Sequence, residues 1–304
     1  AHHRIAHAIA GRDEQFGRKN AADFFKRVRK QARSGETVLI SAEPMYRHVL
    51  VDPDEERPSP TDLVAEREDR MLRYAQAVHE CTSAFDVTVL VMLRRQDLFA
   101  ESLYAEQVLS TGYGREIERF TGERDHMFDY RRRLDVWAHV FGEDRISVRV
   151  FERWALATSI ERVFVDWLGL EWSDDFGIGR RRNVTPTRTL VEFKRLINTQ
   201  GQSAEVNTLY RRWVERLAER LPADELGALG RYYLQPHDRI EMLRRYAEGN
   251  QRLARRFCGR DELFLDDVNE DLVDYVDRPQ LGQKRYRDLT RQLLAIIADE
   301  AGSS

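Results

Sequence analysis

One apolar run constrains the fold of this chain more than any other feature of its sequence. Residues 87–93 read VTVLVML, with a threonine as the only polar side chain. A helix that spans a bilayer needs about 20 apolar residues, so this run has the length of a strand. An apolar strand without polar alternation is typical of a parallel sheet whose two faces are both covered by helices. The run therefore predicts a buried parallel sheet.

Two further β-rich runs and a series of helical patterns extend this prediction. Residues 37–41 and 146–151 follow turn-like positions at Gly35 and Gly142. Between the three runs, apolar side chains recur at helical spacing. The predicted helices there comprise residues 21–33, 61–81, 97–110 and 125–141. Strands that alternate with helices are typical of an α/β domain built in three layers.

The remainder of the chain is predicted to be almost wholly helical. The segments with helical periodicity are residues 160–168, 187–198, 206–221, 236–257 and 286–298. No Gly/Ser-rich linker and no internal repeat divides the sequence. We therefore predict one domain over residues 1–304. Residues 1–155 form its α/β core, a parallel sheet flanked by helices, and residues 156–304 form a helical C-terminal part.

Composition argues against several classes of protein. The 304 residues are 42% hydrophobic, which is enough for a sizeable core and too much for a disordered chain. The 49 basic and 52 acidic residues give a net charge of −3, which argues against a nucleic-acid binder. The opening residues show no secretory-signal pattern, and Cys81 and Cys258 make no disulfide framework. These features predict a cytoplasmic protein without a transmembrane segment.

The segment after the apolar run offers a place for an anion. Arg94 and Arg95 follow the predicted strand directly, and a helix is predicted to begin near Asp97. Ligands of open α/β sheets bind at this carboxyl edge, and a helix N-terminus favours negative charge. Arg94 and Ser102, eight positions apart, could bring a guanidinium and a hydroxyl to one phosphate. The alternative is a surface arginine and an ordinary helix serine.

The same segment resembles the 3'-phosphate-binding signature of the sulfotransferases that use 3'-phosphoadenosine 5'-phosphosulfate (PAPS). In that signature an arginine ends a strand, and a serine lies eight residues later in the next helix. Arg94 and Ser102 stand at these two positions. Other segments resemble bacterial members of the family, in order along residues 1–260. They are LISAE (39–43), FDY through FG (128–142), VRVFE (148–152), FVDWLGL (164–170), RNVT (182–185) and YAEGN (246–250).

The resemblance implies a P-loop-like α/β fold and the transfer of a sulfuryl group from PAPS to a hydroxyl or amine. It implies that Arg94 and Ser102 bind the 3'-phosphate of PAPS. Arg181 and Arg182 are expected to join them from a loop that closes over the nucleotide. A polar, carbohydrate acceptor is expected, as for bacterial members that modify glycans, and no metal is expected. Loops 52–61 and 110–125 are where acceptor specificity is expected, because loops at this edge normally carry it.

The general base of the family is a histidine or a glutamate, which points to His3 or Glu43 in this chain. Each of these assignments has a plainer alternative. Glu43 could simply pair with a nearby arginine. His2 and His3 could be terminal residues or a helix cap. Likewise, the arginines of residues 180–182 could form a solvated basic turn.

One departure from the family is large. Its members begin with a strand and a loop containing Lys-x-Gly-Thr-Thr, which holds the 5'-phosphosulfate through main-chain amides and a lysine. The present sequence contains neither this loop nor a GxxxxGK[ST] pattern. We expect the natural chain to begin upstream of Ala1. The alternative is a non-catalytic pseudoenzyme of the same fold that binds a nucleotide or a glycan. A P-loop kinase is disfavoured, because it would need the Walker lysine.

Overall fold

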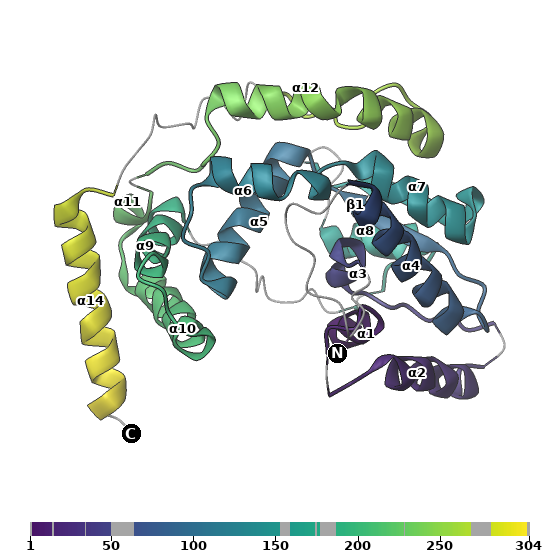
Figure 1. The fold of residues 1–304 in the computed structure, drawn as a ribbon, viewed down its shortest axis with the longest axis horizontal. Helices are drawn as coiled ribbons and strands as arrows, with labels where there is room; N and C mark the ends of the chain where they lie inside the picture. The colour runs from purple at the N-terminus through teal and green to yellow at the C-terminus, as the bar shows by residue number, and fades with distance from the viewer. Residues whose placement is uncertain are drawn as a thin grey trace. The chain divides into compact units, whose positions relative to one another are not determined.

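The computed structural model describes residues 2–13, 15–33, 35–49, 64–152, 159–173, 175–176, 187–227, 229–268 and 281–302. Two compact units are present (Figure 1). Unit 1 comprises Ala1–Leu93, Asp129–Arg149 and Glu248–Leu263. Unit 2 comprises Arg94–Phe128, Val150–Ala247 and Phe264–Ser304. Because each unit is assembled from separate stretches of chain, its core depends on contacts between residues far apart in the sequence.

Two of the three predicted strands form. β1 (Val89–Leu93) and β2 (Ile146–Val150) pair in a two-stranded parallel sheet, so the fold has α/β character within a mostly helical chain. In β2, buried and half-buried residues alternate, as in a strand with one covered face. In β1, Leu93 is buried and the four residues before it are half-buried. The expected burial of both faces of this strand is therefore wrong for its first four residues.

The third predicted strand does not form. Residues 37–41 make no strand ladder, and Val38 and Leu39 are 40% and 47% exposed. A β-rich composition favours extended backbone, but a strand also needs a neighbour with which to exchange hydrogen bonds. Among the described residues, no neighbouring chain segment supplies these bonds to residues 37–40.

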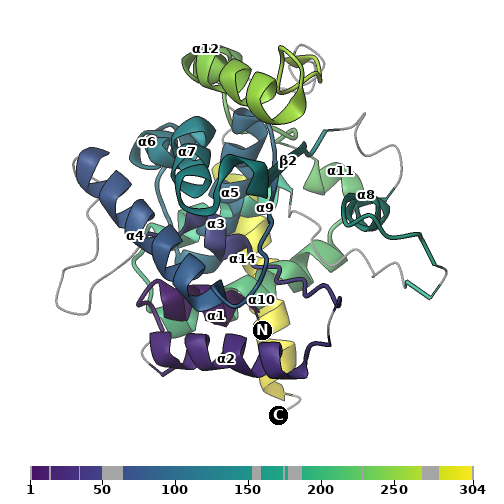
Figure 2. The same ribbon diagram turned by 90° about the vertical axis from the view of Figure 1, so that its right-hand side faces the viewer.

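Unit 1 consists mainly of helices around the sheet. They are α1 (His2–Ile9), α2 (Arg18–Gln31), α3 (Glu43–Arg47), α4 (Val64–Thr82) and α7 (Tyr130–Phe141), with the short turn η2 (Glu143–Arg145) before β2. Helix α4 packs on α7, and α1 packs on α2 and α3. Figures 1 and 2 both show α1 beside α2. Helix α7 buries Tyr130, Leu134 and Trp137, which recur at helical spacing and confirm the predicted amphipathic pattern.

Unit 2 contains the larger apolar core. Its helices are α5 (Gln96–Thr111), α6 (Ile117–Glu123), α8 (Ile160–Trp167), α9 (Arg188–Asn198), α10 (Ala204–Arg220), α11 (Ala223–Leu226) and α14 (Gln283–Gly302). Helix α12 (Pro236–Leu253) begins in this unit and continues into the π-helical turn η3 (Ala254–Cys258). Helix α5 packs on α9 and α10, and α10 packs on α14. Every helix predicted from periodicity beyond residue 155 is confirmed in its described part.

The glycine-containing segment 110–125 contains regular secondary structure. It holds α6, and the turn η1 (Asp125–Met127) follows. Its start is fixed by Lys194, which is fully buried and donates to the side-chain oxygens of Asn198 and Asn207. The two asparagine side chains in turn donate to main-chain carbonyls at the end of α5 and just beyond it. These carbonyls belong to Val108, Ser110 and Tyr113.

Candidate functional site

The candidate anion site lies where two parallel strands end. Arg94 follows β1 directly, and Phe151 follows β2 directly. Since β1 and β2 are paired and parallel, their carboxyl ends lie at one edge. The guanidinium carbon of Arg94 lies 5.7 Å from the centre of the Phe151 ring. The Phe151 side of this cation–π pair is partly open to solvent, because Phe151 is 37% exposed.

The neighbouring Arg95 forms hydrogen bonds with other residues of the protein. Its Nε and Nη2 atoms donate to the two carboxylate oxygens of Asp97 at 2.8 and 2.9 Å, a two-point pairing. Its Nη1 atom donates to the main-chain carbonyl of Asp266 at 3.0 Å. Arg95 is 3% exposed and Asp97 is fully buried. Arg95 is therefore part of the packing of α5, whereas Arg94 lies half-buried at the sheet edge.

A second arginine completes this buried network. Arg239 of α12 donates to Asp97 and, at 2.7 Å, to Oε1 of Glu101. The same oxygen accepts the main-chain N–H groups of Tyr233 and Leu234, each at 3.0 Å. Burial raises the pKa of Glu101 from its usual 4.5 to about 7, while Arg239 and the two N–H donors act in the opposite direction. The two arginines and two acids form one cluster inside unit 2, which has no net charge when both acids are ionised.

Ser102 is the next residue of α5 after Glu101 and lies in the second turn of the helix. It is half-buried, and its hydroxyl makes no hydrogen bond with the described residues. Ser102 lies six positions after the first residue of α5, Gln96, a rise of about 9 Å along the axis. Arg94 and Ser102 belong to the same unit, and no hydrogen bond joins them.

The two residues predicted as general bases lie in unit 1. Glu43 begins α3, and its side chain is 60% exposed with an oxygen 3.7 Å from Nη2 of Arg47. The structure thus contains the arginine pair that was the plainer alternative for this residue. His3 lies in the first turn of α1 and is exposed. Arg181 and Arg182, and the predicted acceptor loop 52–61, lie outside the described residues.

A histidine pair in unit 1 was not predicted from the sequence. Nδ1 of His7 lies 2.9 Å from Nε2 of His48, so one ring donates its N–H to the other. Burial lowers the pKa of His48 to about 3, and burial followed by the charge of His3 lowers the pKa of His7. The pair joins α1 to the residue that follows α3, which is a packing role. The pair could not be predicted from sequence spacing, because the two histidines are 41 positions apart.

One group of side chains in the described ranges has metal-ligand spacing. His237, Asp238 and Glu241 near the start of α12 place one ligand atom each within 4.8 Å of the others. His237 and Asp238 lie 3.4 Å apart, and Glu241 also pairs with Arg245 at 3.3 Å. None of the three is buried, and solvated acids on the first turn of a helix already complement its dipole. The group has an adequate structural explanation without a metal.

The sequence matches no protein-family model, and no solved structure matches the chain. A curated protein of Archaeoglobus fulgidus, named only as an uncharacterized protein, is 27% identical to the chain over 192 residues. This stretch covers 62% of the chain and 50% of the relative, so the chain spans about half the length of the curated relative it matches. Within the described residues, no helix combines the length and the hydropathy needed to cross a membrane.

Proposed function

We propose that this chain is a PAPS-dependent sulfotransferase that transfers a sulfuryl group to a hydroxyl or amine of a polar, carbohydrate acceptor. The observation that carries the proposal is the different use of two adjacent arginines after β1. Arg95 is locked into the buried cluster with Asp97, whereas Arg94 lies at the carboxyl edge of the sheet beside Phe151. The family signature places its phosphate-binding arginine at the position of Arg94.

The surroundings of Arg94 suit a nucleotide. A guanidinium binds a phosphate through two parallel, charge-assisted hydrogen bonds. The Phe151 ring next to it offers a flat apolar face, partly exposed, to a base or sugar. Ser102 carries a hydroxyl with no hydrogen-bond partner in the described part of the chain, as a ligand-binding hydroxyl would. In this proposal Arg94 and Ser102 bind the 3'-phosphate, and Arg181 and Arg182 contribute to the same subsite.

The chemical step needs a base for the acceptor proton. A new S–O or S–N bond forms as the acceptor oxygen or nitrogen loses its proton to a carboxylate or imidazole. The bond from sulfur to the 5'-phosphate oxygen breaks, and adenosine 3',5'-bisphosphate leaves. Glu43 and His3 remain our two proposals for this base. Both side chains are exposed, so an acceptor could reach either of them from solvent.

One observation favours a second candidate, a non-catalytic protein that binds a nucleotide or a glycan. The five lysines of the chain lie within helices: Lys19, Lys26 and Lys30 in α2, Lys194 in α9, and Lys284 in α14. The family's lysine instead stands in a loop between a strand and a helix. None of the five lysines has that location, so none of them corresponds to the family's lysine.

Binding of adenosine 3',5'-bisphosphate to an Arg94→Ala variant tests the proposal. Since a charge-assisted hydrogen bond contributes about 1.5–3 kcal/mol, we expect isothermal calorimetry to show affinity lowered at least about tenfold. Arg162→Ala is a matched control, because Arg162 also lies over an aromatic ring, Trp172, at 4.5 Å. Equal affinity of the Arg94 variant and the control would remove Arg94 from the site.

Sulfate transfer separates the two candidates. Labelled PAPS is incubated with the protein and a panel of glycans. Transfer that the Arg94→Ala variant loses and the Arg162→Ala variant keeps supports the sulfotransferase. Tight nucleotide binding with no transfer to any acceptor supports the non-catalytic candidate.

A further inference from the structure

Helix α2 carries a charge opposite in sign to that of the whole chain. Residues 18–33 contain seven basic residues against the single acid Asp23, a net charge of +6 in a chain of net −3. Three of the five lysines of the protein lie on this one helix. The helix buries Ala21 and Phe25, and its basic side chains lie elsewhere on its circumference. The members of this basic face are Arg18, Lys19, Lys26, Arg27, Arg29, Lys30 and Arg33.

Most of these charges are uncompensated. Lys26 pairs with Asp23 at 3.3 Å. Five others are exposed and form no ion pair with any residue in the described ranges; they are Lys19, Arg27, Arg29, Lys30 and Arg33. The first turn of α2 has Arg18 and Lys19 and no acid, although the helix dipole favours acids there. Positive charge in the first turn lowers the stability of α2. Such an arrangement is expected of a surface that attracts an anionic partner.

The chain that follows α2 has free main-chain hydrogen-bonding groups. The carboxylate of Glu36 accepts the N–H of Arg33 at 2.8 Å, and further along the N–H of Ser41 donates to Nδ1 of His2 at 3.2 Å. Between these two anchors, no hydrogen bond within the described part of the chain reaches the main chain of residues 37–40. Residues 37–39 are also exposed. An extended, β-rich and unpaired segment is a template for pairing with another strand.

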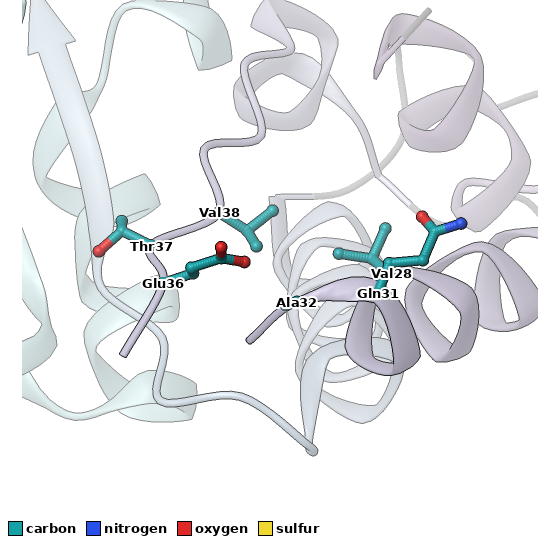
Figure 3. Close-up of a pocket in the computed structure, with 6 residues that line it drawn as sticks. All are labelled: Val28, Gln31, Ala32, Glu36, Thr37 and Val38. Carbon is teal, nitrogen blue, oxygen red and sulfur yellow. The ribbon is translucent and has the colours of Figure 1, made fainter. Parts of the chain in front are cut away.

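A cleft lies between this segment and the end of α2 (Figure 3). Val28, Gln31 and Ala32 line it from the helix, and Glu36, Thr37 and Val38 line it from the extended segment. The apolar side chains of Val28, Ala32 and Val38 can receive one apolar side chain of a ligand. Arg27 and Arg29 precede and follow Val28 in α2, so one exposed cation lies about 100° around the helix on each side of this cleft residue.

We propose that this surface binds an acidic, extended peptide segment of a partner protein. The peptide pairs its main chain with residues 37–40, places an apolar side chain in the cleft, and presents carboxylates to Arg27 and Arg29, the exposed cations on either side of Val28. Strand addition of this kind takes affinity from main-chain hydrogen bonds and specificity from alternate side chains. A nucleic acid or an anionic membrane would use the cations alone. The peptide is favoured because it also uses the unpaired main chain and the apolar cleft.

The proposal is tested with a fluorescent nine-residue peptide in which glutamate alternates with valine. We expect its anisotropy to show saturable binding to the full chain that weakens as salt is raised. The double variant Arg27→Ala/Arg29→Ala should bind at least tenfold more weakly. Lys284→Ala is the matched control, since Lys284 is an exposed lysine at the start of α14, and it should bind like the unmodified protein.

The strand-pairing component needs a separate measurement. A peptide in which glutamate alternates with proline has the same charge but lacks half of the N–H donors and cannot form a regular strand. The proline peptide should bind at least tenfold more weakly than the valine peptide. Val38→Pro in the protein should weaken binding of the valine peptide to a similar degree. Hydrogen exchange at residues 37–40 should slow when the valine peptide is added.

Three outcomes would overturn the proposal. One is the absence of binding by the valine peptide at millimolar concentration. Another is equal binding of the valine and proline peptides with no protection of residues 37–40. The third is tighter binding of a single-stranded oligonucleotide or of phosphatidylserine vesicles, which would assign the basic face to another class of partner. None of these outcomes bears on Arg94, so this test and that of the sulfotransferase are independent.

Discussion

Two groups of basic residues, one in each unit, are used in opposite ways. In unit 2, Arg95 and Arg239 are 3% and 1% exposed, and each forms ion pairs with buried acids. In unit 1, the cations of α2 are exposed, and most have no acid within reach in the described ranges. The first arrangement compensates the charge inside the protein, while the second leaves it exposed, where the proposed acidic peptide would meet it.

In an arginine-rich sequence, the burial and the partners of each arginine indicate its role. A buried arginine with two carboxylate partners is a structural element, since removing either side leaves an unpaired charge in the core. An exposed cation without a partner adds little to stability and can bind a ligand. Arg94 stands between these extremes. It is half-buried, adjacent to the buried network and next to an aromatic ring at a sheet edge.

Among the variants that test this comparison, Arg239→Ala is expected to change the free energy of unfolding most. The substitution leaves Asp97 and Glu101 in the core without one of their cations. Breaking a buried ion pair costs about 3–5 kcal/mol, so urea denaturation followed by circular dichroism should show a large loss of stability. The matched substitution on α2, Arg29→Ala, should change stability by less than about 0.5 kcal/mol. Similar values for the two variants would contradict the division into structural and available cations.

A smaller effect is expected from the titration of Glu101. Its pKa in the folded protein, about 7, lies above the 4.5 of an unperturbed glutamate. The folded state therefore binds this proton more tightly than the unfolded state. The resulting stability is present below pH 4.5 and is lost as pH rises towards 7, with a slope of up to about 1.4 kcal/mol per pH unit.

Glu101→Gln removes this titration and should flatten the fall in unfolding free energy between pH 5 and pH 8. Glutamine can still accept the N–H groups of Tyr233 and Leu234 through its carbonyl oxygen. Glu118→Gln serves as the control for the substitution, because Glu118 is an exposed residue of α6 outside the cluster. An unaltered profile in the Glu101 variant would mean that another group governs this pH range.

The smallest effect concerns the first turn of α2. Lys19→Glu replaces a cation by an acid at the helix N-terminus, and we expect a gain of about 0.3–1 kcal/mol at low salt. The gain should nearly vanish in 1 M NaCl, where the Debye length falls to about 3 Å. Equilibrium urea denaturation at two salt concentrations measures both values. A loss of stability in this variant would show that Lys19 has a structural role and would weaken the contrast with Arg239.

The helices could be predicted because their signal is local. The spacing of Tyr130, Leu134 and Trp137 indicates α7 without knowledge of its neighbours, and the apolar run at residues 87–93 similarly indicates β1. Residues 37–41 have the composition of a strand as well. Whether such a run becomes a strand depends on a partner elsewhere in the chain, and single-sequence periodicity contains no information about that partner.

The roles of residues in the candidate site also depend on partners that the sequence does not reveal. Arg94 and Arg95 are adjacent and chemically identical, so the sequence cannot assign them different roles. Their roles separate only through residues that are distant in the chain. Arg239, 142 positions from Asp97, completes the cluster that holds Arg95, and Phe151 lies over Arg94. Resemblance to a family signature selected Arg94 and Ser102, but it gave no indication of the buried network beside them.

The anchoring of the segment after α5 has a consequence for protein engineering. The carbonyls of Val108, Ser110 and Tyr113 are held by two asparagines, and both asparagines are oriented by the ammonium of Lys194. A graft that exchanges residues 110–116 between relatives would therefore lose its conformation unless positions 194, 198 and 207 are transferred with it. The unit that can be recombined is this loop together with one face of α9 and the first turn of α10.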